Sequence, residues 1–250
     1  MLGQALRIAV AGGLFISSVL AAEPLKDLQD KLASARSDQP IRVKVDVALE
    51  HQGKAPLHLN DVKEHGRVIV VAGPRGVEIR EQKRIGSSTY LSLWRSPRKT
   101  GPGEAAVPMV EDEEAMMLID PAGWLSPFLS GSTLVEDQAV TWEGQPARLL
   151  VIRPSQLPAE NTAEKASTKD EPKPVVVEGK IWLGADGLPL ALEATTELRL
   201  PAFTMTQHQT LTFQQIGGRL LVARSTAAFS GTALLALRGT DVKTMKVTAD

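Results

Sequence analysis

The chain has 250 residues, with 28 Lys and Arg against 29 Asp and Glu, and it contains no cysteine. The missing cysteines exclude disulfides, thiolate catalysis, cysteine-based metal sites and a lipobox anchor. The formal net charge of −1, with no basic block interleaved with aromatic residues, gives no support for a nucleic-acid partner.

Residues 1–22 have the three parts of a secretory signal peptide in order. Arg7 gives a basic start, Ile8–Leu20 is apolar, and the small residues Ala21 and Ala22 precede Glu23. Cleavage after Ala21 or after Ala22 fits equally well. The alternative is an uncleaved anchor, but the apolar stretch of about 13 residues is shorter than a bilayer span. The sequence therefore predicts export, and export without cysteines favours a bacterial periplasm. Residues 23–250 are expected to form a single domain.

The first mature element is predicted to be a helix over Leu25–Ala35, because Leu25, Leu28 and Leu32 repeat at helical spacing. The period then changes to two. Ile41–Leu49 alternates apolar and polar residues, which predicts a strand with one buried face.

The middle of the chain combines short strands with one further helix. Asp120–Gly131 begins with Asp-Pro and carries its large apolar residues at helical spacing, which predicts the helix. Residues 154–174 are rich in proline and charge and are expected to form a long surface loop. The strands expected here are a weak one around Leu57–Leu59, then Arg67–Ala72, Val77–Glu81, Ser88–Arg95, Ala115–Ile119, Gln138–Trp142 and Ala147–Arg153.

The C-terminal third predicts four long strands joined by tight turns. Asp186-Gly187 and Gly217-Gly218 supply the positive φ angles that such turns require. The four strands are Val175–Leu183, Leu188–Leu200, Phe203–Gln215 and Leu220–Phe229, and one or two more follow in Ala233–Leu237 and Val242–Val247. The sum is 11 or 12 strands and two helices, a mainly β chain whose antiparallel meander closes partly or fully into a barrel.

The hairpin Gly179–Glu193, with Trp182 before an Asp-Gly turn and Leu188-Pro189 after it, resembles the bacterial periplasmic lipoprotein-carrier superfamily of the LolA, LolB and RseB type. The N-terminal helix, the long meander and the Asp120–Gly131 segment fit the same resemblance. It implies an unclosed half-barrel with a lid-like helix. It also implies a non-enzymatic protein whose partner is a lipid, a lipoprotein acyl chain or another hydrophobic ligand.

Two groups of residues are candidates for the binding site of such a ligand. The short helix would form a lid with Trp124, Leu125, Phe128 and Leu129, and the wall would include Trp94, Met116, Met117, Phe203 and Met205. The alternative for every one of these residues is an ordinary place in the core. An envelope-protein interaction module with a filled interior is the corresponding alternative function.

No motif predicts catalysis, a metal or a cofactor. His51, His58 and His65 lie seven apart, a spacing that puts strand residues on opposite faces. The acidic run Glu111–Glu114 is expected to be a solvated loop, and His208 is expected to face solvent on a threonine-rich strand. An envelope hydrolase is the third alternative, but no Gly-x-Ser-x-Gly elbow occurs.

Overall fold

The computed structural model describes residues 16–54, 63–73, 76–85, 109–154, 175–200, 203–233 and 238–250. The predicted strands at Leu57–Leu59, Ser88–Arg95 and Ala233–Leu237 lie wholly or mostly outside these residues, as does nearly all of the predicted loop 154–174.

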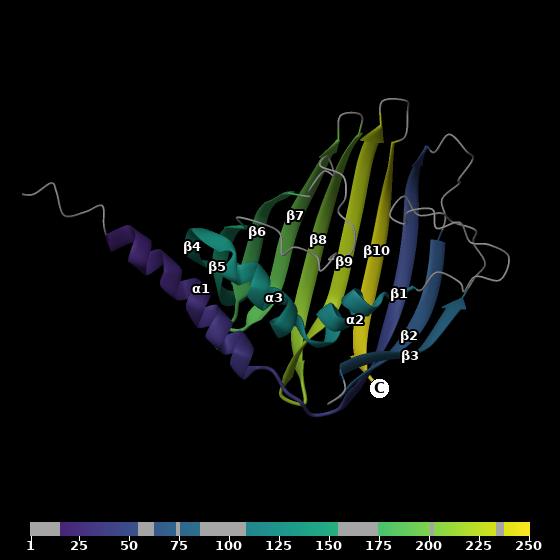
Figure 1. Cartoon of the computed structure of the whole chain (residues 1–250), viewed down its shortest axis with the longest axis horizontal. Coiled ribbons are helices and arrows are strands. Elements are labelled where there is room, and N and C mark those ends of the chain that lie inside the picture. Colours follow the sequence, from purple (N-terminus) through teal and green to yellow (C-terminus); the bar gives the residue numbers. More distant parts are fainter. Residues whose placement is uncertain are drawn as a thin grey trace, which may run out of the picture.

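The described strands form one antiparallel sheet of ten members in the order β3-β2-β1-β10-β9-β8-β7-β6-β5-β4 (Figure 1). Every neighbour in this order is also a chain neighbour, except β1 and β10. β3 and β4 are the two edges, so the sheet is unclosed, as the resemblance implied. The strands are β1 Ile41–Lys54, β2 Lys63–Gly73, β3 Gly76–Ile85, β4 Ser132–Trp142, β5 Gln145–Pro154, β6 Val175–Leu183, β7 Pro189–Leu200, β8 Phe203–Ile216, β9 Arg219–Ala233 and β10 Arg238–Ala249.

Three helices accompany the sheet: α1 Ile16–Ser34, α2 Asp112–Ile119 and α3 Pro121–Ser130. α2 corrects the prediction of a strand over Ala115–Ile119, because this apolar run continues a helix that begins at Asp112. The described part of the chain therefore has ten strands and three helices, instead of 11 or 12 strands and two helices. No described helix is long and apolar enough to cross a membrane.

The tight turns follow the sequence pattern closely. Gly187 has φ 80° after β6, and Gly217 and Gly218 have φ 60° and 77° between β8 and β9. These angles lie in the left-handed region, where glycine carries no steric cost. The predicted Asp-Gly and Gly-Gly turns are confirmed.

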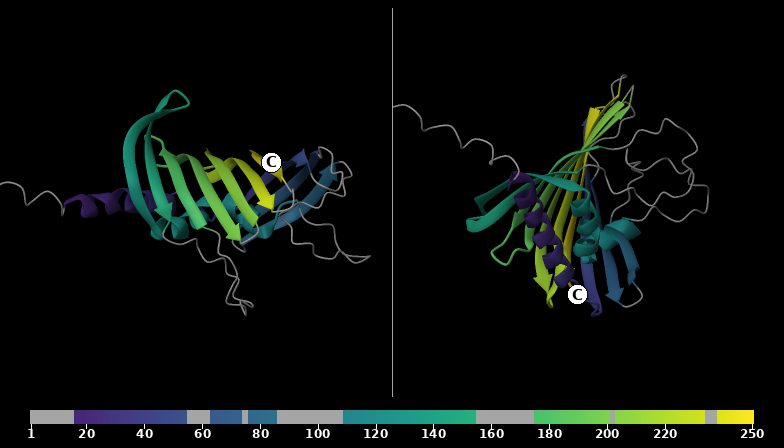
Figure 2. Two further views of the ribbon diagram at one scale, coloured as in Figure 1. Left: turned by 90° about the horizontal axis from the view of Figure 1, so that it is seen from above. Right: turned by 60° about the vertical axis from the view of Figure 1, so that its left-hand side comes forward.

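α1 lies beside α3, with its N-terminal part projecting past the β4 edge, and α2 and α3 lie on one face of the sheet (Figure 2). We call this the inner face. The alternating strand β1 turns Val43, Val45 and Val47 to it, and all three are buried. α1 buries Leu28 and Leu32 against the same core, as its helical spacing predicted. The core therefore lies between the helices and the inner face.

A single residue joins the two short helices. Asp120 ends α2 and is the N-cap of α3, where its Oδ1 accepts a hydrogen bond from Gly123 N at 3.0 Å. Its other oxygen pairs with the guanidinium of Arg36, just after α1, at 2.5 Å. Because only Asp120 separates them, α2 and α3 form one segment, and we call it the α2–α3 segment.

Candidate functional site

The register of the sheet arranges the inner face in rows that run across the strands. One row is almost wholly apolar and lies under the helices; we call it the apolar row. Its members are Gly66, Val47, Met245, Ser225, Leu211, Leu192, Ile181 and Leu150. The adjacent row, two residues further along each strand, brings charges to the same face; we call it the mixed row. Its members are Glu64, Leu49, Lys243, Ala227, Gln209, Ala194, Gly179 and Ile152.

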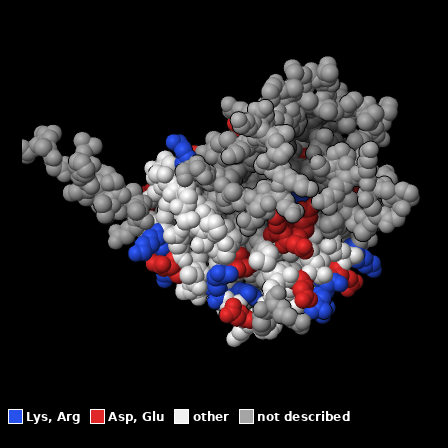
Figure 3. All heavy atoms as spheres, in the orientation of Figure 1, with Lys and Arg blue, Asp and Glu red and all other residues white. Residues whose placement is uncertain are grey.

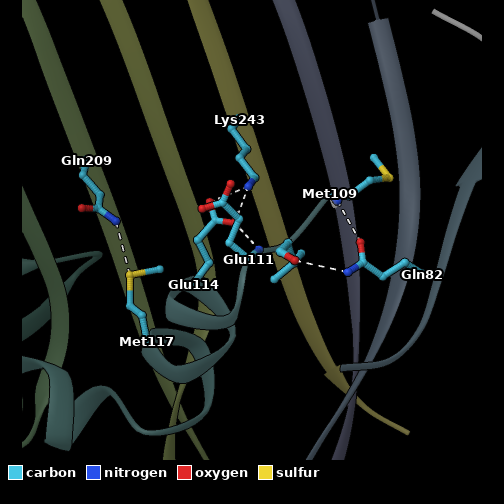
Figure 4. Close-up of polar contacts among 8 residues, drawn as sticks. Gln82, Met109, Glu111, Glu114, Met117, Gln209 and Lys243 are labelled. Atoms are coloured by element: carbon cyan, nitrogen blue, oxygen red, sulfur yellow. Dashed lines mark hydrogen bonds and ion pairs between the residues drawn. The ribbon is translucent and has the colours of Figure 1, made fainter. Parts of the chain in front are cut away.

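The α2–α3 segment meets the mixed row through polar side chains (Figure 4). Lys243 Nζ contacts both carboxylate oxygens of Glu114, with 2.5 Å to Oε2. The Lys243 side chain is 14% exposed and that of Glu114 is 29% exposed, so water screens this ion pair only partly. Gln209 Nε2 donates to Met117 Sδ at 3.4 Å. β10 and β8 thus hold α2 from the sheet side.

The acidic run Glu111–Glu114 is the beginning of α2, which corrects its interpretation as a loop. Glu111 is the N-cap, and its backbone N–H donates to Glu114 Oε2 at 3.0 Å, one half of a capping box. Carboxylates at a helix N-terminus also interact favourably with the helix dipole. Glu111, Asp112 and Glu113 are exposed, and Figure 3 shows acidic side chains gathered at the place of α2.

Met109 and Val110, which precede the N-cap of α2, are held to β3 by one amide side chain. Gln82 Oε1 accepts from Met109 N at 2.8 Å, and Gln82 Nε2 donates to Val110 O at 3.3 Å. Met109 and Val110 are both buried, and the Met109 side chain lies over Gly66 of the apolar row. Gln82 therefore holds the chain just before α2 to β3 through one accepted and one donated hydrogen bond.

Three buried polar residues, Glu64, Asp241 and Ser225, complete the inner face. Glu64 belongs to the mixed row. Asp241 lies two residues before Lys243 on β10 and points to the same side. Glu64 is 4% exposed and Asp241 is 5% exposed. Ser225 in the apolar row is buried as well. The inner face is therefore amphiphilic, with an apolar part under the helices and a charged part beside it.

The structure places most of the predicted lid residues in the core. Leu125, Phe128 and Leu129 are buried, and Trp124 is partly buried with its ring stacked on Phe128 at a centroid distance of 6.5 Å. These side chains join residues from β1, β5, β6 and β7 in one cluster. In this structure the α2–α3 segment fills the interior that it covers.

Of the predicted wall residues, the structure describes the side chains of Met116 and Met117 alone. Met117 is buried in α2, whereas its neighbour Met116 is 44% exposed. Phe203 and Met205 belong to β8, but their side chains, and the whole of Trp94, lie outside the described residues. Sequence reasoning did not identify Lys243, Glu114, Gln209, Gln82, Glu64 or Asp241. His208 is exposed, as predicted, and its Nδ1 lies 3.0 Å from Thr195 Oγ1.

A bidentate ion pair lies at the β4 side of the inner face. Arg148 Nε and Nη2 contact the two carboxylate oxygens of Asp137 at 2.8 and 2.6 Å. The hydrogen bond from Arg148 is the main cause that lowers the pKa of Asp137 below its ordinary 3.8, and burial opposes it. The hydrogen bond to Asp137 is in turn the main cause that raises the pKa of Arg148, and the charge of Asp27 of α1 adds to it. This pair therefore lies close to α1.

Replacing Asp137 with asparagine is expected to reduce stability in a pH-dependent way. Because the folded pKa lies below the unfolded one, the carboxylate stabilises the fold above pH 3.8, and this is lost as the pH falls through the folded pKa. Both side chains are about a third exposed or more, so we expect a loss below about 1 kcal/mol at pH 7. Urea unfolding of both proteins at neutral and strongly acidic pH measures it. A difference that stays constant with pH would contradict the assignment.

No protein-family model and no curated protein matches the chain. Among solved structures, it is similar to a DUF1329 family protein from Desulfovibrio piger at 13% identity and a TM-score of 0.34, covering 92% of this chain and 93% of that one. It is also similar to a conserved protein with a hot dog fold from Alicyclobacillus acidocaldarius at 11% identity and a TM-score of 0.14, covering 93% of this chain and 87% of that one. Both TM-scores are below 0.5, so neither likeness informs the function of this chain.

Proposed function

We propose that the mature protein is an exported, non-enzymatic protein of the cell envelope that binds a hydrophobic ligand, either a lipid or a lipoprotein acyl chain. The ligand binds on the inner face, and the α2–α3 segment is the lid that it displaces. The observation that carries this proposal is the unclosed sheet whose apolar row is covered by short helices rather than by strands.

The α2–α3 segment is suited to movement because side chains hold it to the sheet. Lys243, Gln209 and Gln82 make polar contacts with α2 and the residues before it, and Ser132 Oγ of β4 donates to Phe128 O of α3 at 2.7 Å. Buried apolar side chains of the segment also pack into the core cluster. Such contacts can be broken without disturbing the hydrogen bonds between strands. The strands of the inner face thus keep their register while the segment moves.

Displacing the segment exposes apolar surface on both the lid and the sheet. A ligand that occupies the same place offsets that exposure, because each buried CH₂ group contributes about 0.8 kcal/mol. A fully buried chain of about 16 carbons would contribute roughly 13 kcal/mol by the same measure. Long acyl chains are therefore suitable competitors for the lid, whereas short polar metabolites are not.

The packing of α1 is compatible with export. α1 begins at Ile16 and so includes the end of the predicted signal peptide, but its buried residues Leu25, Leu28 and Leu32 follow both predicted cleavage sites. Removal of residues 1–22 would leave these contacts in the mature protein. The signal pattern and this packing together support the periplasm as the location that we propose.

The test is to crosslink the lid to the sheet and to measure how much ligand the protein takes up. The chain has no cysteine, so Met117→Cys and Gln209→Cys introduce a unique thiol pair where two side chains already touch. A short bis-thiol reagent then bridges α2 to β8. We expect the delipidated, unbridged variant to take up a fluorescent fatty acid, and the bridged protein to take up at least about tenfold less.

The unbridged variant is the matched control, since it carries the same two substitutions. Native mass spectrometry of the mature protein from the periplasm of its own cells gives the second readout, and we expect copurified lipid. Absence of lipid in both measurements would contradict the proposal. Equal loading of the bridged and unbridged forms would show that the α2–α3 segment does not act as a lid.

A filled interior favours a second candidate, an interaction module for envelope proteins. Leu118, Leu125 and Leu129 are at most 2% exposed, so the interior that they occupy is already packed. Such a module would carry no lipid and would crosslink to one envelope protein. The bridged variant separates the two candidates, because locking the lid would leave the crosslink unchanged.

A further inference from the structure

The face of the sheet opposite the α2–α3 segment, which we call the outer face, carries a row of charged side chains across five neighbouring strands. The first four members each lie next in the chain to a member of the apolar row, and the last is directly opposite the fourth, so all of them point outward. Because neighbouring strands lie about 4.8 Å apart, the row is roughly 19 Å long. We call it the basic row, and its members from β9 to β3 are Arg224, Lys246, Asp46, Arg67 and Lys83.

The basic row concentrates positive charge that the chain as a whole does not have. The formal net charge of the chain is −1, whereas the row has four cations and one carboxylate. That carboxylate belongs to Asp46, whose Oδ1 accepts from Arg67 Nε at 2.9 Å. Arg224, Lys246 and Lys83 are exposed and form no ion pair with another residue that the structure describes. Three cations of the row are therefore open to a partner.

The register also places like charges directly across from each other at two positions. Arg224 is opposite Lys246, and Arg67 is opposite Lys83. Like charges in this position destabilise an antiparallel pair. Their separation is also shorter than the Debye length of about 8 Å at physiological ionic strength, so their potentials add. The stability of the sheet does not account for this arrangement, but an anion lying over each pair would relieve the repulsion.

The surroundings of the basic row favour an extended anionic surface over a folded protein as that partner. Protein interfaces depend on large apolar side chains at their centre. Among the described residues, the exposed large apolar side chains are Met116 of α2 and Val135 of β4, both on other elements. The neighbours of the row along its strands include the small residues Ala48, Thr226, Thr244 and Thr248. Charge without an apolar anchor suits the phosphate groups of an anionic bilayer, which attract each nearby Lys or Arg.

We infer that the basic row docks the protein on an anionic bilayer, with lipid phosphate groups over the Arg224–Lys246 pair and over the Arg67–Lys83 pair. This inference goes beyond the proposed function, because docking uses the face opposite the lid and needs no ligand in the interior. The α2–α3 segment would remain free to move while the protein is held at the membrane surface.

The test measures cosedimentation of the full mature protein with vesicles of phosphatidylcholine, either alone or with about 30 mol% phosphatidylglycerol. At low salt we expect the wild-type protein to bind the anionic vesicles at least about tenfold more tightly than the neutral ones. At about 0.5 M salt this preference should fall below about twofold, because exposed charges are screened. Arg224→Gln/Lys246→Gln/Lys83→Gln should show the same small preference at low salt, since each cation near the surface contributes about fivefold.

A second triple variant controls for net charge. Lys26→Gln/Lys31→Gln/Arg153→Gln removes three exposed cations of α1 and β5, outside the basic row. It changes the net charge by the same amount and should keep the preference of the wild type for anionic vesicles. An equal loss in both triple variants would show that net charge decides binding, and would overturn the docking role of the basic row.

Uptake of a fluorescent fatty acid by the same proteins separates this inference from the proposed function. The basic-row variant should take up as much as the wild type, because its substitutions lie on the outer face. A wild-type protein that takes up fatty acid but does not prefer anionic vesicles overturns the docking role alone. One that prefers them but takes up no fatty acid overturns the proposed function and supports the docking role.

Polyaspartate and thermal unfolding complete the experiment. Release of the protein from anionic vesicles by polyaspartate, at an equal or lower concentration of negative charge, would indicate an acidic protein as the partner and overturn the bilayer. We expect no such release. The basic-row variant should unfold at the temperature of the wild type or above it, because it lacks the two like-charged pairs.

Discussion

Replacing Leu125 with alanine is expected to lower the free energy of unfolding by about 2–5 kcal/mol. Leu125 is fully buried where α3 meets the sheet, and it belongs to the cluster that joins both. The substitution removes its apolar contacts and leaves a cavity that neighbouring side chains fill only in part. Urea unfolding followed by circular dichroism measures the loss.

The two adjacent methionines of α2 provide a matched comparison for that result. Met117 is 4% exposed and should also cost about 2–5 kcal/mol when replaced with alanine, whereas Met116 is 44% exposed and should cost less than about 0.5 kcal/mol. Similar small effects at Leu125, Met117 and Met116 would show that the α2–α3 segment rests away from the sheet in solution.

Replacing Gly66 with alanine is expected to destabilise the protein by about 1–3 kcal/mol through overpacking. A Cβ atom at this position would lie 2.0 Å from Met109 Sδ and 3.0 Å from the backbone oxygen of Lys83. The methionine side chain is flexible, but Met109 is only 2% exposed and has little room to move. The displaced residue would also pull on the hydrogen bonds that Gln82 makes to this segment.

Two variants control the Gly66 experiment. Gly73 lies on the same strand, and a Cβ atom added there would have no other atom within 4 Å, so Gly73→Ala should leave stability within about 1 kcal/mol of the wild type. Gly66→Ala combined with Met109→Ala should cost less than the sum of the two single changes, because the smaller side chain relieves the overlap. Additive costs would mean that the overlap is not the cause.

The sequence predicted the sheet well because its signals are local. Alternation over Ile41–Leu49 defines which face of β1 is buried, and the Asp-Gly and Gly-Gly pairs mark turns through a requirement for positive φ. Neither signal depends on a distant part of the chain. The half-barrel with an open edge on each side came from the family resemblance, since alternation alone does not decide whether a sheet closes.

The sequence failed at α2 because a short apolar run does not distinguish a helix from a strand. Ala115–Ile119 has no polar residue to reveal a period. The missed signal was just before it: Glu111 and Glu114 have the spacing of a capping box, here with a carboxylate as the N-cap side chain. If the four acids are interpreted as a solvated loop, the apolar run that follows has no visible helix start.

Only one of two features of the charged part of the candidate site could be predicted from the sequence. The period of two on β10 puts Asp241 and Lys243 on the face of Met245 and Val247, and this could have been inferred. The pairing of Lys243 with Glu114, 129 positions away, depends on how α2 packs across the sheet. No local pattern encodes such a contact.

The pairing of β1 with β10 has a consequence for the order in which the chain folds. Arg42 and Asp250 form an ion pair across 208 positions, while every other strand pairs with its neighbour in the chain. In a chain that emerges N-terminus first, β1 has one unpaired edge until β10, the last strand, is available. Such long-range pairing is slow and leaves the early strands prone to aggregation. A factor that shields the free edge of β1 during this interval would then help the chain to fold.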